Sequence, residues 1–191
     1  VAKAGGKVNF ISKIGNDPYG EMAIQMYKES NVDTSNVIIS KDYKTGVAGI
    51  LVNKQTGENA ITVVPGAAGK ITKEDIDQAS DAIKQSSIFL TQLEVSIDVV
   101  EHAIEIARSH NVITILNPGP AAKLQDKTFK LIDYFTPNET ETSFYVNHKV
   151  ETHEELKKAT NQLLDRGIKN VIITLGDKGA YFANNNESFM I

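Results

Sequence analysis

The chain has 191 residues, of which 41% are hydrophobic and 23% charged, and 20 basic against 24 acidic residues give a net charge of −4. This composition is typical of a globular protein, and its mild acidity argues against a nucleic-acid partner, which would require a basic face. There is no cysteine, which excludes disulfide scaffolds, thiol nucleophiles and cysteine-ligated metal sites. No apolar run approaches the ~18 residues of a membrane span, so we expect a soluble, cytoplasmic domain without a membrane partner.

Both ends of the sequence have the pattern of a helix or strand that is cut short. The segment from Val1 to Gly6 matches the last turn of a helix that a glycine terminates. Residues Ser188 to Ile191 are apolar and strand-like, with no polar tail to protect the strand edge. We therefore expect these residues to be the central part of a longer protein.

The N-terminal region begins with a strand and a helix. Residues 8–14 alternate between apolar and polar side chains, which predicts a strand. Asp17-Pro18 then opens a helix, with the aspartate as its N-cap and the proline in its first turn. Tyr19, Met22 and Met26 give this helix one apolar stripe.

A stretch without helices follows. It holds three strand patterns, at residues 37–39, 46–52 and 59–64. The last two are joined by the turn-rich Lys54-Gln55-Thr56-Gly57, which predicts a hairpin or a small meander. Such a small sheet is not stable alone, so we expect residues 36–64 to form a lid on a larger body made of residues 1–35 and 65–191.

From residue 72 onward, helices and strands alternate. Apolar strands are expected at residues 87–93, 112–116, 132–135 and 171–173. Helices are expected to begin at Thr72, Ser96, Asn138 and Thr152, and the first is expected to run to about Gln85. The last helix carries a capping box, Thr152-x-x-Glu155, and a glycine stop at Gly167. Continuous apolar strands between amphipathic helices predict an α/β fold with a parallel sheet covered on both faces.

Polar or glycine- and proline-rich segments follow four successive predicted strands. They are Glu94, Asn117-Pro118-Gly119-Pro120, Thr136 to Glu141, and Thr174 to Gly179. Ligands of parallel α/β sheets bind beyond the carboxyl ends of the strands, so these segments are the candidates for a ligand site.

Each segment also has a purely structural interpretation. Glu94 suits a solvated strand end as well as a carboxylate that accepts hydrogen bonds from a polyol. Asn138 and Glu141 have the spacing of a reciprocal helix cap, yet a helix N-terminus also attracts phosphate, and a nearby glutamate holds Mg²⁺ through water. Gly176 and Gly179 suit a tight turn or a surface on which an adenine nucleotide lies against the backbone.

Several familiar motifs are absent. Gly66-Ala67-Ala68-Gly69-Lys70 lacks the glycine spacing of a P-loop, and no G-x-G-x-x-G segment supports a dinucleotide site. The four histidines show no metal-ligand spacing, and no nucleophile elbow supports Ser/His/Asp catalysis.

Six short segments together resemble one enzyme family. They are Thr45-Gly46-Val47-Ala48, Gly57-Glu58-Asn59, Gln92-Leu93-Glu94, Asn117-Pro118-Gly119-Pro120-Ala121, Thr136-Pro137-Asn138-Glu139-Thr140-Glu141 and Ile173-Thr174-Leu175-Gly176-x-x-Gly179. In this order and spacing, over essentially the whole chain, they resemble the ribokinase-like carbohydrate kinases. The Gln-Leu-Glu, Asn-Pro-x-Pro-Ala and Gly-Glu-Asn elements are similar to those of the ribokinases rather than of fructokinases or adenosine kinases.

The resemblance implies a Rossmann-like sheet sandwiched by helices, with a β-sheet lid that also forms a homodimer interface. It implies transfer of the γ-phosphoryl group of ATP to the 5-hydroxyl of D-ribose. For the sugar it implies Glu94 as a ligand of the hydroxyls, with Ala48, Ile50 and Val63 as a cover from the lid. For the nucleotide it implies Asn138, Thr174, Gly176 and Gly179, and for Mg²⁺ it implies Glu141, acting through water.

Parts of the family pattern do not occur in these residues. The Gly-Gly-Lys-Gly-Ala-Asn segment that grips the sugar, the Gly-Ala-Gly-Asp motif with the general base, and most of the monovalent-cation (K⁺) site have no match. A general base contributes about 10²–10⁴ in rate, so we expect residues 1–191 alone to be inactive and the parent protein to be a ribose kinase. Two alternatives remain open: a non-catalytic sugar- or nucleotide-binding module, and a kinase for another sugar or nucleoside.

Overall fold

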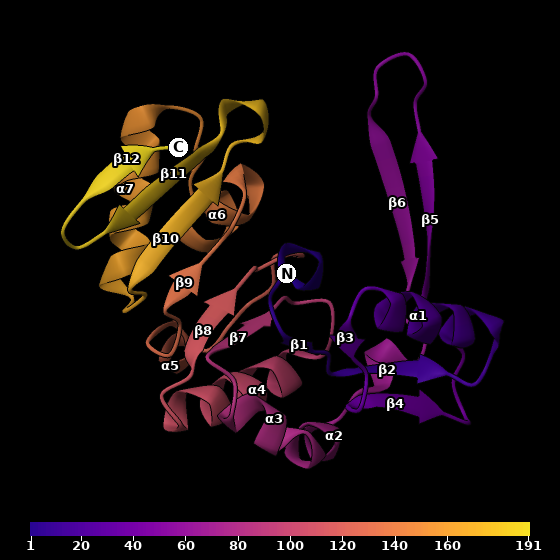
Figure 1. Cartoon of the computed structure of the whole chain (residues 1–191). Coiled ribbons are helices and arrows are strands. Elements are labelled where there is room, and N and C mark those ends of the chain that lie inside the picture. The colour runs from indigo at the N-terminus through magenta and orange to yellow at the C-terminus, as the bar shows by residue number, and fades with distance from the viewer. The chain divides into compact units, whose positions relative to one another are not determined.

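A computed structural model describes residues 1–191, which form two compact units, Val1–Ala79 and Ser80–Ile191 (Figure 1). None of the helices combines the length and the apolar character that crossing a lipid bilayer requires.

The first unit consists of short strands, two short 3₁₀ turns and two helices. Its elements are η1 (Ala2–Ala4), β1 (Val8–Asn9), β2 (Ser12–Gly15), α1 (Pro18–Glu29), β3 (Val32–Asp33), β4 (Val37–Ser40), β5 (Val47–Val52), β6 (Asn59–Val64), η2 (Ala68–Lys70) and α2 (Lys73–Gln78). As predicted, α1 begins at Asp17, whose side chain accepts the Gly20 amide hydrogen. Thr72 and Asp75 form a capping box at the start of α2.

Three strand and helix boundaries differ from the sequence prediction. The strand expected at residues 8–14 is two strands, of which β1 pairs with β3 and β2 pairs with β4. The strand β4 pairs in parallel with β2, so no pairing joins it to the hairpin with which we had grouped it. The helix expected to run from Thr72 to Gln85 ends at Ala79, and α3 (Ser80–Lys84) begins immediately after it.

Strands β5 and β6 form the predicted antiparallel hairpin, which extends as a two-stranded arm in Figure 1. Cross-strand partners in such a pair share a face, so Ala48 and Val63 lie together, next to the pair Ile50 and Ile61. The opposite face carries the pairs Val47–Val64 and Leu51–Ala60. Both faces are apolar and open to solvent, and Ile50 and Leu51 are 60% and 73% exposed.

The second unit is a six-stranded mixed sheet with helices. Its elements after α3 are β7 (Ile88–Thr91), α4 (Ile97–Ser109), β8 (Ile113–Leu116), α5 (Asp126–Phe129), β9 (Tyr134–Phe135), α6 (Glu139–Val146), α7 (His153–Asp165), β10 (Asn170–Thr174), η3 (Gly176–Lys178), β11 (Ala180–Asn184) and β12 (Ser188–Met190). The strand order is β12-β11-β10-β9-β8-β7, and β7 to β10 are parallel.

The four strands predicted from the sequence are parallel as expected, and two further strands at one edge of the sheet, β11 and β12, run antiparallel. Only the short η3 turn separates β10 from β11, and a parallel return would need a crossover of a dozen or more residues. We had not predicted β11, although Tyr181 and Ala183 are buried at alternate positions along it.

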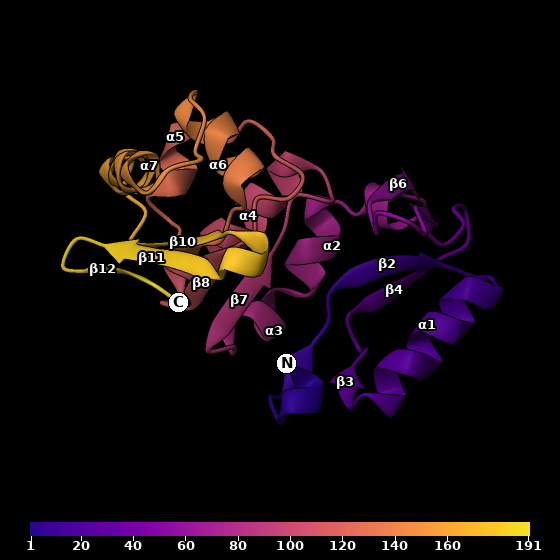
Figure 2. The ribbon, with the colours of Figure 1, turned by 90° about the horizontal axis from the view of Figure 1, so that it is seen from above.

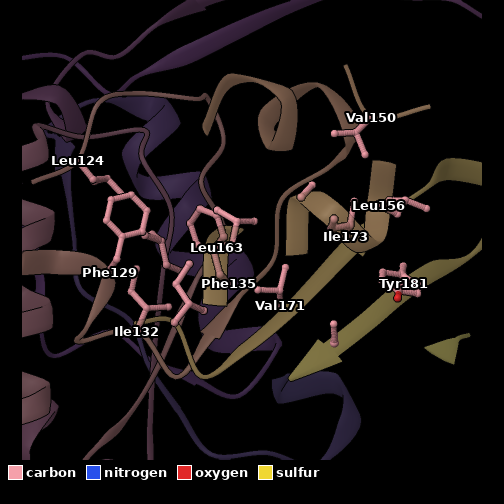
Figure 3. Close-up of a cluster of buried hydrophobic side chains, with 14 of the residues drawn as sticks. Leu124, Phe129, Ile132, Phe135, Val150, Leu156, Leu163, Val171, Ile173 and Tyr181 are labelled. Atoms are coloured by element: carbon pink, nitrogen blue, oxygen red, sulfur yellow. The ribbon is translucent and has the colours of Figure 1, made fainter. Parts of the chain in front are cut away.

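The core of this unit lies between the sheet and helices α4 to α7, which gather on one side of it (Figure 2). Phe135, Val171 and Ile173 from the strands meet Phe129 and Leu163 from the helices, and all five are completely buried (Figure 3). On the opposite face of the sheet, Ile88 and Leu90 of β7 are 52% and 63% exposed.

A buried carboxylate ties four segments together at the start of β9. Asp133 accepts hydrogen bonds from Lys169 Nζ (2.6 Å), Arg108 Nη1 (3.0 Å) and the Thr114 backbone amide (2.9 Å). Burial alone would raise the pKa of Asp133, but the hydrogen bonds from Lys169 and Thr114 and the Arg108 charge outweigh it and lower this pKa. The charged form of Asp133 therefore stabilises the fold.

We expect Asp133→Asn to lower the free energy of unfolding by about 2–4 kcal/mol at pH 7, because it leaves Arg108 and Lys169 without their shared anion. A carboxyl group with a lowered folded-state pKa stabilises above its unfolded pKa of about 4, and this contribution is lost as the pH falls through the folded value. The difference in unfolding free energy between the variant and the original protein should therefore shrink below about pH 4. Urea unfolding from pH 3 to 7 measures this difference. Asp126→Asn removes an exposed ion pair with Arg166 and is the control, for which we expect little effect. A deficit that is independent of pH would contradict the electrostatic origin.

Candidate active site

Backbone hydrogen bonds join the segments that follow β7, β8, β9 and β10 into one edge of the second unit. Leu93 donates to the Gly119 carbonyl (3.0 Å), and Thr136 donates to the Leu116 carbonyl (2.9 Å). Thr174 donates to the Pro137 carbonyl (2.9 Å), and an isolated parallel bridge pairs Thr174 with Asn138. The four segments predicted to carry the site therefore lie side by side at the carboxyl ends of the parallel strands.

Asn138 and Glu141 form a reciprocal cap at the start of α6. The Asn138 side-chain oxygen accepts the Glu141 amide hydrogen (2.8 Å), and Glu141 Oε2 accepts the Asn138 amide hydrogen (2.9 Å). Asn138 is exposed and Glu141 is half-buried. The structural interpretation of this pair is therefore confirmed, and it leaves the second carboxylate oxygen of Glu141 for another partner.

That second oxygen lies next to the loop after β8. A Cβ atom on Gly119 would come within 2.9 Å of Glu141 Oε1 and 3.0 Å of Asn117 Oδ1. Asn117 Oδ1 itself accepts the Gly119 amide hydrogen (3.0 Å), which holds the loop in this conformation. Glu141 Oε1 thus occupies a narrow space between α6 and the Asn117–Pro120 segment.

The turn after β10 contains two glycines with positive φ. Gly176 has φ of +61° and Gly179 of +90°, a region that side chains rarely adopt. A Cβ atom on Gly176 would meet no heavy atom within 4 Å, whereas one on Gly179 would lie 2.0 Å from the Ile191 carbonyl oxygen. Gly176 therefore presents bare backbone to open space, and Gly179 is additionally required by the close approach of the last residue of the chain.

The remaining sugar-binding candidates lie in two places. Glu94 is exposed just beyond β7, in the same unit as Asn138, Glu141 and Thr174. Ala48, Ile50 and Val63 belong to the first unit, where the hairpin register brings all three to one face.

One carboxylate at this edge, that of Glu141, is the candidate for holding a metal ion. Mg²⁺ keeps several waters and binds one or two carboxylates together with substrate phosphates. The structure holds no cluster of three or more metal-binding side chains, so no ready-made protein cage for a metal is present. Glu141 Oε1, beside an uncovered helix N-terminus, fits a carboxylate that orders a hydrated ion.

Two contacts that we had not predicted hold the loop between β8 and α5. The Tyr145 hydroxyl donates to the Ala122 carbonyl (2.7 Å), and burial raises the pKa of Tyr145 to about 12, which keeps it protonated. The buried Glu101 carboxylate accepts the Gln125 amide hydrogen (2.8 Å) and the Thr128 hydroxyl (2.7 Å). Neither residue belongs to a short motif, so only the tertiary structure reveals them.

The comparisons with known proteins agree with this geometry. A family model described as pfkB family carbohydrate kinase matches residues 1–191. The chain is 42% identical over 179 residues to a ribokinase of Staphylococcus aureus, covering 94% of this chain and 59% of that protein. It is 33% identical over 187 residues to a deoxyribokinase of Salmonella typhi, covering 97% and 61%.

A solved structure shares the fold. The crystal structure of Sa239 superposes on the whole chain with a TM-score of 0.94 at 41% identity, and the chain covers 62% of it. An α/β fold of this kind, with polar strand ends along one edge, is typical of proteins that bind a ligand at that edge. The chain belongs to the pfkB family of carbohydrate kinases and has the ribokinase-like fold. It spans about three-fifths of the length of the relatives that it matches.

We expect Asn138→Ala to lower the free energy of unfolding by about 1 kcal/mol, because it removes the acceptor for the Glu141 amide. Asn138→Asp keeps a side-chain oxygen at the cap and should unfold like the original protein. Urea denaturation of both variants separates the capping role of Asn138 from any role toward a ligand. Equal stability of all three proteins would show that the cap contributes nothing measurable.

Proposed function

We propose that the protein carrying this chain transfers the γ-phosphoryl group of ATP to the 5-hydroxyl of D-ribose, with Mg²⁺ as cofactor. One observation carries the proposal: the carboxyl ends of four adjacent parallel strands place two kinds of group along one edge. Glu94 is a carboxylate suited to the hydroxyls of a sugar, and the helix N-terminus at Asn138 and Glu141 is suited to phosphate. The ribokinase and deoxyribokinase relatives support a pentose as the acceptor.

The residues of this edge have distinct parts in the proposed reaction. The exposed amides at the start of α6 attract the phosphate groups of ATP, and Asn138 fixes their direction by capping the helix. Glu141 orders hydrated Mg²⁺, which neutralises charge on the phosphates when bound. Thr174, Gly176 and Gly179 offer the nucleotide an accessible backbone, and Glu94 accepts hydrogen bonds from ribose hydroxyls.

The phosphoryl transfer itself needs groups beyond these residues. The sugar oxygen attacks the γ-phosphorus, the bond to ADP breaks, and the hydroxyl proton passes to a general base. None of residues 1–191 is assigned to that base, and we place it, with the K⁺ site, in further parts of the protein. The cytoplasm, where ATP and free sugars meet, is the compartment that we propose.

We propose that the hairpin β5–β6 serves as a lid over the sugar and as a homodimer interface. Ala48, Ile50 and Val63 would cover the sugar with one face, which keeps water from the γ-phosphate. The opposite face, with Val47, Leu51 and Val64, is also apolar and would be buried against the same surface of a second copy.

We expect the whole protein to release ADP from MgATP when D-ribose is present, with slower release for 2-deoxy-D-ribose, fructose and adenosine. A coupled ADP assay over this panel measures the preference. Faster turnover of 2-deoxy-D-ribose would favour the function of the Salmonella relative. Release with none of the acceptors would favour a non-catalytic binding module.

The variant Glu141→Gln tests the assignment of the metal in the same assay. Glutamine also serves at the third position of a capping box, so stability should hold while the charge beside the phosphates is lost. We expect a fall in kcat of about 10–100-fold and a higher Mg²⁺ requirement. Glu139→Gln, two residues earlier on the same helix, is the matched control.

We expect Leu51→Asp to convert the proposed homodimer into a monomer, because an aspartate in an apolar interface must lose its hydration. Sedimentation velocity at micromolar concentration measures the change. Lys54→Asp, at the exposed hairpin turn, alters charge without entering the apolar face and should leave the dimer intact. An original protein that sediments as a monomer would contradict the interface.

A further inference from the structure

The two strands of the hairpin join the rest of the first unit at one crowded point. A Cβ atom on Gly46 would lie 2.4 Å from the Pro65 carbonyl oxygen, and one on Gly66 would lie 2.5 Å from both the Gly46 nitrogen and the Lys44 oxygen. The Ala67 amide donates to the Lys44 carbonyl at 2.7 Å. The residues Lys44–Gly46 and Pro65–Ala67, which we call the hairpin root, are thus in direct backbone contact.

Asp17 connects this root to the start of α1. Its Oδ1 accepts the Gly20 amide hydrogen (3.0 Å), which is the ordinary bond of a helix N-cap. Its Oδ2 accepts the amide hydrogen of Thr45 (2.8 Å), a residue 28 positions away in the hairpin root. The Asp17 side chain is therefore shared between a helix and the base of the hairpin.

Thr45 also bonds to the end of strand β2, close to Asp17 in the sequence. Its hydroxyl oxygen accepts the Gly15 amide hydrogen at 2.9 Å, at the end of strand β2. A Cβ atom on Gly15 would lie 2.5 Å from both Asp17 Oδ2 and the Thr45 nitrogen, and one on Gly20 would lie 2.2 Å from the Gly15 oxygen. Both glycines permit the close approach that the shared carboxylate needs.

Capping alone does not explain a carboxylate at this position. Asparagine is as good an N-cap as aspartate, but its second terminal atom is an NH₂ donor, which would face the donor N–H of Thr45. Only a carboxylate accepts both amide hydrogens at once. The hydrogen bond from Thr45 is the largest of the effects that lower the pKa of Asp17, so the group is ionised at neutral pH.

We propose that Asp17 is a positioning residue that fixes the hairpin root, and with it the direction of the hairpin face bearing Ala48, Ile50 and Val63. The β5–β6 sheet has only two strands and pairs with no further strand, so the orientation of the hairpin depends on its root. The consequence for catalysis rests on the proposed function, whereas the consequence for the root does not.

Hydrogen exchange measured by mass spectrometry tests the root in the whole protein. We expect Asp17→Asn to accelerate exchange of peptides covering residues 44–64 by about tenfold or more, with α1 little changed, because a hydrogen bond to a charged acceptor is lost while the cap is kept. Asp33→Asn is the matched control, since Asp33 accepts hydrogen bonds from Ser35 and Asn9 in the same unit, away from the hairpin root. Unchanged exchange at residues 44–64 in Asp17→Asn would overturn the proposal.

A second pair of variants keeps the test decisive if Asp17→Asn fails to fold. Thr45→Val removes the hydroxyl that accepts the Gly15 amide and should accelerate exchange at the same peptides, and Thr45→Ser should restore the original rate. Equal exchange in both Thr45 variants would overturn the role of this corner.

Enzyme kinetics separate positioning from a purely structural role. A misdirected lid should raise KM for D-ribose several-fold and increase ATP hydrolysis per sugar phosphate formed, with KM for ATP unchanged. Accelerated exchange with unchanged sugar KM and unchanged hydrolysis would overturn the positioning role. If the original protein phosphorylates no sugar, the proposed function fails, and the exchange measurement still decides whether Asp17 holds the root.

Discussion

The reciprocal cap of Asn138 and Glu141 is the interaction on which the candidate active site depends. Each residue uses one oxygen to satisfy a backbone amide of the other, so the cap fixes both side chains at the start of α6. The same amide network leaves the helix N-terminus open and turns Glu141 Oε1 toward Gly119. The structural and functional interpretations of this motif are therefore not alternatives, because a rigid cap is what holds a carboxylate where phosphate would arrive.

Backbone hydrogen bonds also fix the other segments that follow the parallel strands β7 to β10. Each segment after a strand is bonded to its neighbour, from Leu93 through Gly119 to Thr136 and Thr174. The hydrogen bonds of Glu101 and Tyr145 hold the loop that follows β8 and so support one of these segments. Buried hydrogen bonds of this kind confer geometric precision on side chains that are themselves exposed.

Much of this architecture could be predicted from the sequence, because it is written in local patterns. The capping boxes at Thr72, Asn138 and Thr152 fix three helix starts. The four site segments could be located because the carboxyl ends of parallel strands share an edge. Gly176 also has the positive φ that its place in a tight turn predicted.

The features that could not be predicted from the sequence depend on contacts between residues far apart in the chain. Whether Ala180–Asn184 returns antiparallel, or whether β4 pairs with β2 rather than with the hairpin, is decided by tertiary pairing and not by periodicity. Asp17 shows the limit most clearly, since its N-cap bond to Gly20 could be predicted and its bond to Thr45 could not. A capping motif predicts the partner of one carboxylate oxygen. The second oxygen can accept a hydrogen bond from a residue far away in the sequence, and the motif does not predict that partner. In this chain the second oxygen of Asp17 accepts the Thr45 amide hydrogen, and the second oxygen of Glu141 lies beside the loop that follows β8.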